Sequence, residues 1–135
     1  MSQKRLFEEA ETIISVLHSG ERQDLLILII PSHDKGKRLL NNQEQWANAA
    51  LGLFADLFGG ATAFKTFKGI YKTDDGEILE DIPILIECYA KRTDVEDRDK
   101  LVELLRFAKR MGNETRQAAV ALMVNDVFHE IKHFR

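Results

Sequence analysis

The feature that most constrains the fold is the uninterrupted apolar run from Leu25 to Ile30. Successive side chains of a strand point to opposite faces, so a run without polar alternation is typical of a strand covered on both faces. The run is far too short to span a bilayer, which takes about 20 apolar residues. We therefore predict a central strand with other parts of the protein packed on both of its sides.

Length and charge are those of a small cytoplasmic protein. The 135 residues are 44% hydrophobic, which is enough for one core, so we predict a single domain over residues 1–135. The formal net charge of −3 comes from interspersed charges, which predicts neither a membrane nor a nucleic-acid partner. Cys88 is the only cysteine and lies in an apolar run, and the acidic N-terminal segment lacks a signal-peptide pattern. Both features favour a cytoplasmic location.

Three segments carry apolar side chains at helical spacing and are bounded by capping residues or glycine. We predict helices over residues 3–18, from Asn41 or Asn42 to Gly59, and from a Thr93–Glu96 capping box to Gly112.

Three further segments are rich in strand-forming residues. The first two are separated by Asp74-Asp75-Gly76, a sequence typical of a hairpin turn. We predict strands over residues 62–73 with a bulge near Gly69, over residues 77–90 with Pro83 weakening the ladder, and over residues 118–124 before a short tail.

This element order predicts an α+β fold with a ferredoxin-like βαββαβ antiparallel sheet over residues 24–131 and an extra N-terminal helix. The two later helices would cover one face of the sheet. The other face is left for the N-terminal helix or for a second subunit, because so apolar a surface does not stay in water. We therefore predict a homodimer.

Topology brings three polar segments to one edge of this sheet: the loop from Pro31 to Arg38, the turn at 74–76, and the connection from Met111 to Arg116. The loop carries three permanent cations just before a helix N-terminus, a combination that favours phosphate or carboxylate. We predict a small anionic ligand at this edge. The predicted ligand-binding residues are Lys35, Lys37, Arg38, Trp46 and Gln117.

The same loop contains an imidazole that could transfer protons. A histidine beside a carboxylate is an effective general acid or base near neutral pH. We predict a catalytic group of His33, Asp34 and Glu114, in which one of the two carboxylates pairs with His33.

Plainer interpretations stay open for these segments. Short loops rich in Ser, Asp, Lys and Gly are commonly solvated turns, and Gly36-Lys37 lacks the upstream glycine of a P-loop. Trp46 could equally anchor its helix in the core. The basic and aromatic run over residues 64–72 invites an RNA-binding interpretation, but the acidic charge of the domain and the missing glycine–aromatic pattern argue against it.

One literal metal-binding motif, H-E-x-x-H, runs from His129 to His133. On a helix this spacing places two imidazoles on one face as zinc ligands, with the glutamate as general base. Lys132 lies inside the motif and no third ligand follows it, so we predict no metal site. No cofactor is predicted either.

Several segments together resemble a family of small uncharacterised bacterial proteins. The resemblance covers about residues 25–131 and implies no activity, cofactor or partner. It rests on a P-x-H-D segment at Pro31–Asp34, Trp46, an F-G-G-A-T segment at Phe58–Thr62, Gly69-Ile70-Tyr71 with Gly76, and an M-G-x-E-x-x-Q segment at Met111–Gln117.

Three functions are compatible with these observations. The first is a small-ligand-binding or regulatory protein with a polar site at the edge of the sheet. The second is an acid/base enzyme of hydrolase type that uses His33 with Asp34 orienting it. The third is a structural module for protein–protein interaction, without a ligand of its own.

Overall fold

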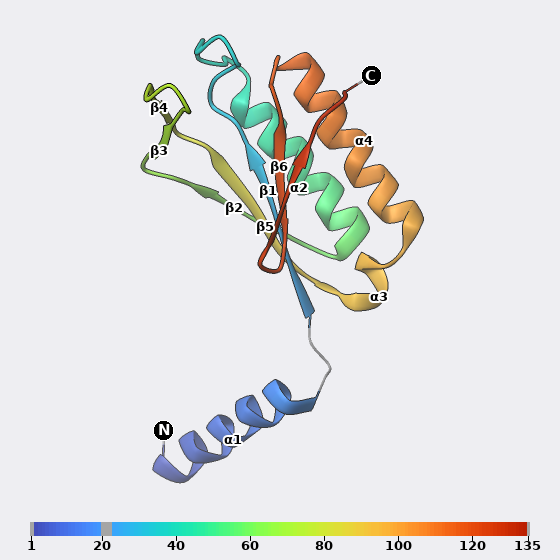
Figure 1. Cartoon of the computed structure of the whole chain (residues 1–135). Coiled ribbons are helices and arrows are strands. Elements are labelled where there is room, and N and C mark those ends of the chain that lie inside the picture. Colours follow the sequence, from blue (N-terminus) through green and yellow to red (C-terminus); the bar gives the residue numbers. More distant parts are fainter. Residues whose placement is uncertain (1, 20–22, 135) are drawn as a thin grey trace.

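The computed structural model describes residues 2–19 and 23–134. Within these residues the main sheet is antiparallel and has five strands in the order β2-β5-β1-β6-β7 (Figure 1). The strands are β1 (Gln23–Ile30), β2 (Thr62–Lys65), β5 (Ile84–Lys91), β6 (Val120–Val124) and β7 (Val127–Ile131). The predicted α+β class and antiparallel sheet are confirmed, with one strand more than expected.

The central position of β1 follows from its apolar run. Leu26, Leu28 and Ile30 are buried beneath two helices, whereas Leu25, Ile27 and Ile29 are half-buried on the opposite side. The predicted central strand is confirmed, but the described residues cover only one of its faces. We call the other side of the sheet the open face.

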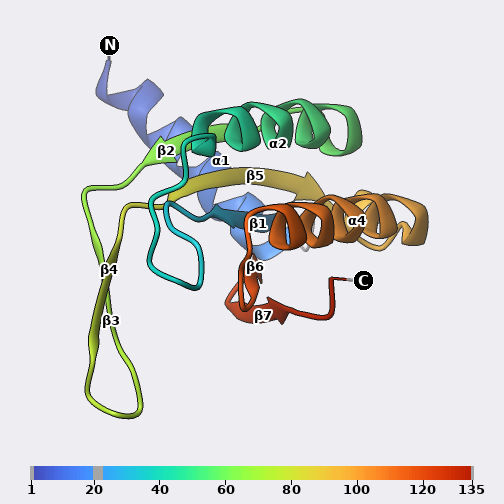
Figure 2. The same cartoon turned by 90° about the horizontal axis from the view of Figure 1, so that it is seen from above.

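The helices α2 (Gln43–Phe58) and α4 (Arg98–Glu114) lie on the same side of the sheet, as predicted (Figure 2). Helix α2 ends where expected, at Gly59, whose φ of 93° is the left-handed conformation that glycine adopts without strain. Together with β1 and β5, the two helices bury the apolar core around Phe54, Leu104 and Met111.

Both ends of α4 differ from the prediction. The Thr93–Glu96 capping box is wrong, because that segment forms the short helix α3 (Arg92–Val95). The N-terminus of α4 is capped by Asp97, whose carboxylate accepts the N–H groups of Asp99 and Lys100. Gly112 does not end the helix. It leaves room for the Phe134 ring, since a Cβ at this position would lie 2.4 Å from a ring carbon.

The predicted strands 62–73 and 77–90 are each broken in two. Their inner halves form a separate hairpin of β3 (Gly69–Lys72) and β4 (Ile78–Asp81), which we call the arm. The arm projects on the side of the sheet away from the helices (Figure 2). Its turn falls at 74–76 as predicted, with Gly76 at a φ of 85°. At its base the hydroxyl of Thr66 donates to the carbonyl oxygen of Pro83 at 2.7 Å.

The predicted tail is wrong, because residues 127–131 form β7 and pair with β6. The H-E-x-x-H segment therefore begins on a strand, where the helical geometry of a zinc motif is absent. Across residues 2–19 and 23–134 there is no cluster of three or more His, Cys, Asp or Glu side chains that could hold a metal.

The predicted N-terminal helix is confirmed as α1 (Gln3–Ser19). It extends from the N-terminal end of β1 away from the sheet (Figure 1), and every one of its described side chains is exposed. Among the described residues no helix is both long and apolar enough to cross a membrane.

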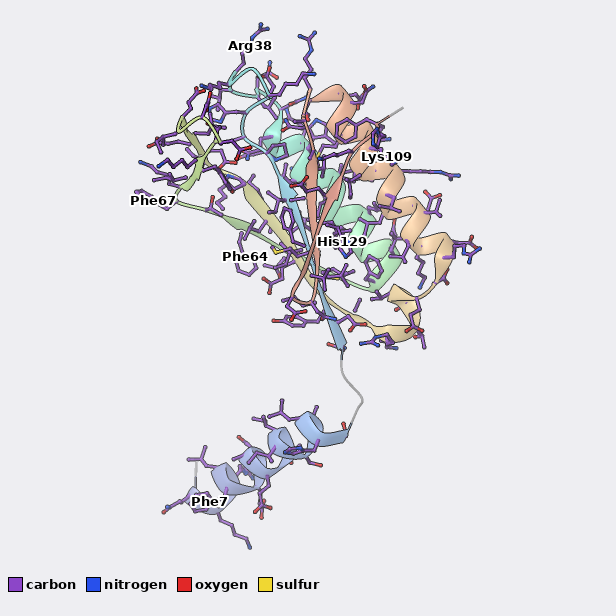
Figure 3. All side chains as sticks on the ribbon, in the orientation of Figure 1. Phe7, Arg38, Phe64, Phe67, Lys109 and His129 are labelled. Carbon is purple, nitrogen blue, oxygen red and sulfur yellow. The ribbon has the colours of Figure 1, made fainter. Side chains whose placement is uncertain are left out.

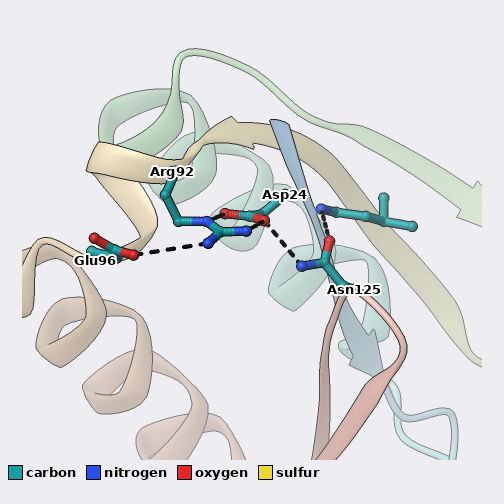
Figure 4. Close-up of polar contacts among 5 residues, drawn as sticks. Asp24, Arg92, Glu96 and Asn125 are labelled. Carbon is teal, nitrogen blue, oxygen red and sulfur yellow. Dashed lines mark hydrogen bonds and ion pairs between the residues drawn. The ribbon is translucent and has the colours of Figure 1, made fainter. Parts of the chain in front are cut away.

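An ionic cluster around the buried Asp24 fixes the N-terminal end of β1 (Figure 4). Asp24, which is 2% exposed, accepts two hydrogen bonds from the Arg92 guanidinium at 2.6 and 2.8 Å. Asn125, in the turn between β6 and β7, donates to Asp24 at 3.0 Å and accepts the Leu25 N–H at 2.9 Å. These bonds, Arg92 first, hold the pKa of Asp24 below its usual value.

Candidate functional site

The loop between β1 and α2 is shaped by its own hydrogen bonds. One carboxylate oxygen of Asp34 accepts the N–H groups of Gly36 at 2.8 Å and Arg38 at 2.9 Å. His33 and Leu39 form an isolated β-bridge across the loop. The bond from the Arg38 N–H is the main reason that the pKa of Asp34 is lowered. Asp34 therefore organises the loop, and its carboxylate does not orient His33.

The three polar segments meet at one edge of the sheet, as predicted. The Lys35 N–H donates to the Arg116 carbonyl at 2.9 Å, and the Gln117 side-chain amide donates to the His33 carbonyl at 2.9 Å. Lys37 forms an ion pair with Glu77 in the turn of the arm. Loop, arm and the end of α4 are thus tied together around one space.

That space is a cavity of about 300 Å³, which we call the His33–Asp81 cavity. Five of the residues singled out in the sequence line it: His33, Asp34, Lys35, Lys37 and Gln117. The arm supplies the facing wall, with polar groups from Tyr71, Glu80 and Asp81 and apolar contacts from Ile78 and Leu79.

Three predicted site residues do not line the cavity. Trp46 is half-buried between α2 and α4, edge-on to the Phe107 ring at a centroid distance of 5.7 Å, so it anchors its helix. Arg38 and Glu114 are both exposed and lie outside the cavity wall. The structure therefore does not pair Glu114 with His33.

The partner of the His33 ring is its neighbour in sequence. The hydroxyl oxygen of Ser32 lies 2.7 Å from His33 Nδ1 and accepts the Ile82 N–H at 2.8 Å. Ser32 is 2% exposed, so its hydroxyl proton needs an acceptor within the protein, and Nδ1 is the acceptor in reach. This arrangement assigns the proton of the neutral ring to Nε2, the nitrogen that remains for a ligand.

The arm contributes an unsatisfied carboxylate. Asp81 Oδ1 is buried and has no hydrogen-bond partner among the described residues. Burial raises the pKa of Asp81, and the charge of a protonated His33 acts in the opposite direction. Gly69, the residue opposite Asp81 in the arm, makes room for the carboxylate, because a Cβ there would lie 2.5 Å from Oδ1.

Tyr71 separates this cavity from a second one of about 230 Å³ on the open face. Both cavities share Tyr71, Asp81, Pro31 and Gln117, and the second has an apolar floor on β1, β6 and β7. Burial, and then the charge of Asp81, raise the pKa of the Tyr71 hydroxyl. The site is thus a cavity with many polar side chains that adjoins a smaller one with an apolar floor.

Sequence reasoning missed Asp81 and Ser32. Tyr71, which also lines the cavity, pairs with Leu79 inside the arm. The available signals were the Ile82-Pro83 break, which lets the arm leave the main sheet, and Gly69 in an otherwise strand-like run.

Comparison with solved structures places this fold among known ones, although no family model and no curated protein matches the sequence significantly. Phage SAM lyase in complex with S-methyl-5'-thioadenosine aligns with a TM-score of 0.58 and 10% identity, over 84% of this chain and 92% of that chain. The fold is similar to that of phage SAM lyase. The same lyase in its apo state aligns with a TM-score of 0.58 and 11% identity, over 86% of this chain and 94% of that chain. At such low identity the likeness concerns the fold alone.

Proposed function

We propose that the protein binds a small polar molecule in the His33–Asp81 cavity, through hydrogen-bond donors that reach Asp81. The observation that carries this proposal is the buried, unpartnered Oδ1 of Asp81. Leaving a buried acceptor without a partner costs about 1–3 kcal/mol. Because Oδ1 itself is out of reach of solvent, a ligand N–H or O–H group recovers this free energy when the Asp81 carboxylate, which lines the cavity, turns Oδ1 towards it.

The charges around the cavity refine the ligand class expected from the sequence. Lys37 is neutralised by Glu77, and Arg38 lies outside the cavity wall. Of the other charged side chains in the wall, Lys35 stands beside three carboxylic acid side chains, Asp34, Glu80 and Asp81. We therefore propose a ligand that combines hydrogen-bond donors with an anionic or neutral polar part, in place of a simple anion.

The structural neighbour supplies the first compound to test. Phage SAM lyase has been solved with S-methyl-5'-thioadenosine, and this nucleoside thioether carries two ribose hydroxyls and an amino group as donors. Carboxylates are common partners of ribose hydroxyls in nucleotide sites. The apolar second chamber beside Tyr71 would suit the less polar part of such a compound.

A second candidate function is proton-transfer catalysis at the same site. His33 is held by Ser32 in one orientation, and Asp81, with its raised pKa, lies on the facing wall. Two titratable groups in different environments across one cavity are the usual arrangement of a general acid and a general base. In this proposal Asp81 has the role beside His33 that was predicted for Asp34 or Glu114.

Binding is tested by isothermal titration calorimetry with S-methyl-5'-thioadenosine and with SAM. We expect the wild type to bind at least one of them, Asp81→Asn to bind it at least about tenfold more weakly, and Glu114→Gln to bind like the wild type. Glu114 is the matched control because it is exposed and outside the cavity.

Equal affinity of the wild type and Asp81→Asn for the bound compound contradicts the proposed role of Asp81. If neither compound binds, thermal-shift screening of a library of hydrogen-bond-donating metabolites follows, and no stabilisation across that library contradicts a binding function. Chromatography of the same mixtures tests catalysis. Formation of a product that is lost in His33→Gln supports the proposal of catalysis. If none of the bound compounds is converted, that proposal is contradicted.

We also propose the ferredoxin-like description for the segment from β1 to β6. The order β2-β5-β1-β6, with α2 and α4 as the two crossovers on one face, supports it. The arm and β7 are then additions to this core.

A further inference from the structure

We propose that the ligand of this site is an α-amino acid with an apolar side chain. In this assignment the ammonium group binds Asp81, the carboxylate lies in the His33–Asp81 cavity, and the side chain lies in the smaller cavity on the open face. The inference rests on the binding function proposed above and names the class of ligand.

The larger cavity offers one carboxyl group that is available to a cation. Of the carboxyl groups in its wall, Asp34 is engaged by two N–H groups of its own loop, and Glu80 pairs with Lys68 at 3.8 Å. Asp81 is left, with an Oδ1 that has no hydrogen-bond partner among the described residues. An ammonium group donates up to three hydrogen bonds, and its charge offsets the burial that raises the pKa of Asp81.

The same cavity offers donors for a carboxylate. Lys37 is paired with Glu77, and the Arg38 side chain points away from the sheet (Figure 3). Lys35 lies in the cavity wall and forms no ion pair within residues 2–19 and 23–134. The Nε2–H of His33 is a second donor, because Nδ1 is occupied by its own hydrogen bond. A ligand carboxylate can accept from both.

The two cavities separate these groups as an α-carbon separates its substituents. Asp81 lines both cavities, so an ammonium bound to it lies where they adjoin. His33 and Lys35 line only the larger cavity, which places the carboxylate there. The third substituent, the side chain, then points past Tyr71 into the smaller cavity, because Tyr71 also lines both.

The smaller cavity suits an apolar side chain. Its volume is about 230 Å³, and its apolar wall comes from Ile29, Ala119, Val120, Ala121 and Phe128. Besides Asp81 it has a second carboxylate in its described wall, Glu130, which pairs with Lys132 at 3.1 Å. A basic side chain therefore finds no free partner at Glu130, and a hydrocarbon or aromatic side chain is placed there without loss of hydrogen bonds.

The test is an NMR titration of the full chain with L-leucine and L-phenylalanine, which detects binding even at millimolar concentration. Each is compared with its N-acetyl derivative, which lacks the ammonium, with its amide, which lacks the carboxylate, and with glycine, which lacks the side chain. We expect at least one of the two amino acids to bind, with shifts at His33, Tyr71 and Asp81, and each comparison compound to bind at least about tenfold more weakly.

Two substitutions assign the ends of the ligand. Lys35→Met should weaken binding of the amino acid about threefold and leave its amide unaffected. Lys72→Met, exposed on the arm and outside both cavities, should change neither. Ala121→Leu fills the smaller cavity, so it should weaken binding of the amino acid at least about tenfold and leave the weak binding of glycine unchanged. Ala118→Leu, exposed and outside both cavities, is its matched control.

Three results would overturn the inference: no binding of either amino acid, equal binding of an amino acid and its amide, or a preference for L-lysine. Equal binding of the amide would indicate a peptide N-terminus or a simple amine. The binding function is judged separately, with S-methyl-5'-thioadenosine, SAM and the metabolite library. If a compound of that set binds at Asp81 and neither amino acid does, the ligand class is wrong and the binding function stands.

Discussion

Ser32 and His33 are adjacent in sequence, yet their side chains bond to each other, with the Ser32 hydroxyl oxygen 2.7 Å from His33 Nδ1. The same oxygen accepts the Ile82 N–H at the junction of arm and sheet. One buried hydroxyl therefore sets the orientation of the imidazole and holds the arm at the cavity.

Replacing Ser32 with alanine should remove the hydrogen bonds that hold the His33 ring and the Ile82 N–H. The Ile82 N–H loses its acceptor, so we expect Ser32→Ala to lower the free energy of unfolding by about 1–3 kcal/mol in urea denaturation. Nitrogen NMR shifts of the His33 ring should change from the Nε2–H tautomer to a mixture. Ser15→Ala on exposed α1 should do neither. An unchanged tautomer in Ser32→Ala would refute the orienting role of the hydroxyl.

Asp81→Asn should make the protein more stable at neutral pH while it weakens ligand binding. Burial raises the pKa of Asp81 above its usual 3.8, so the folded protein binds the proton more tightly than the unfolded chain. Wild-type stability should therefore fall, relative to Asp81→Asn, as pH rises from 3.8 through the raised pKa. Urea unfolding of both proteins from pH 3 to pH 7 measures this difference, and a difference that does not vary with pH contradicts the pKa shift.

Gly69→Ala should disturb the cavity and spare the main sheet. The new Cβ would stand 2.5 Å from Asp81 Oδ1, so the carboxylate has to move. We expect loss of binding of whichever probe the wild type binds, with an unchanged far-UV circular dichroism spectrum. Gly52→Ala is the matched control. Gly52 is at an exposed position of α2, a Cβ there would have nothing within 4 Å, and the substitution should raise stability by about 0.5–1 kcal/mol.

The Asp24 cluster should make the fold sensitive to acid. Hydrogen bonds from Arg92 and then Asn125 lower the pKa of Asp24. The stabilisation is thus present above the unfolded value of 3.8 and is lost as pH falls through the lower folded pKa. We expect Asp24→Asn to cost about 1–3 kcal/mol at pH 7 and progressively less below pH 3.8, as measured by urea unfolding. A constant cost down to pH 2 would count against the cluster.

Cys88 should be nearly inert to thiol reagents in the folded protein. The side chain is 4% exposed, and burial raises its pKa to about 11, so little reactive thiolate forms at pH 8. Ellman's reagent should react slowly with the native chain and stoichiometrically after denaturation. Rapid reaction of the native chain would show that the strand β5 opens.

The parts of the fold that the sequence predicted well are those with strong local signals. The central strand β1 and the C-terminal end of α2 follow from the apolar run and from the freedom of Gly59, whereas the Asn42 side chain makes no capping hydrogen bond. The meeting of His33 with Gln117 followed from strand order alone. Predicting these features requires the order of the strands but no information about individual contacts between distant residues.

The features that sequence reasoning missed depend on contacts between distant segments. From the sequence alone Gly69 predicts a bulge, because the Asp81 carboxylate that fills the space beside it comes from a distant segment. Pro83 predicts a weak point within one strand, although it marks the junction of two strands. Strand β7 carried a metal-like motif in place of the alternation typical of a strand. The role of Asp81 can be recognised only in the folded protein, where the arm faces the loop between β1 and α2.

The arm leaves the main sheet between Thr66 and Lys68 and returns at Pro83, and it shares no strand pairing with the core. Its residues can consequently vary in length and type without repacking Phe54 or Leu104. Selection for a new ligand and selection for a stable core would then act on different stretches of the gene, so relatives with this architecture should diverge fastest in the hairpin that closes the cavity.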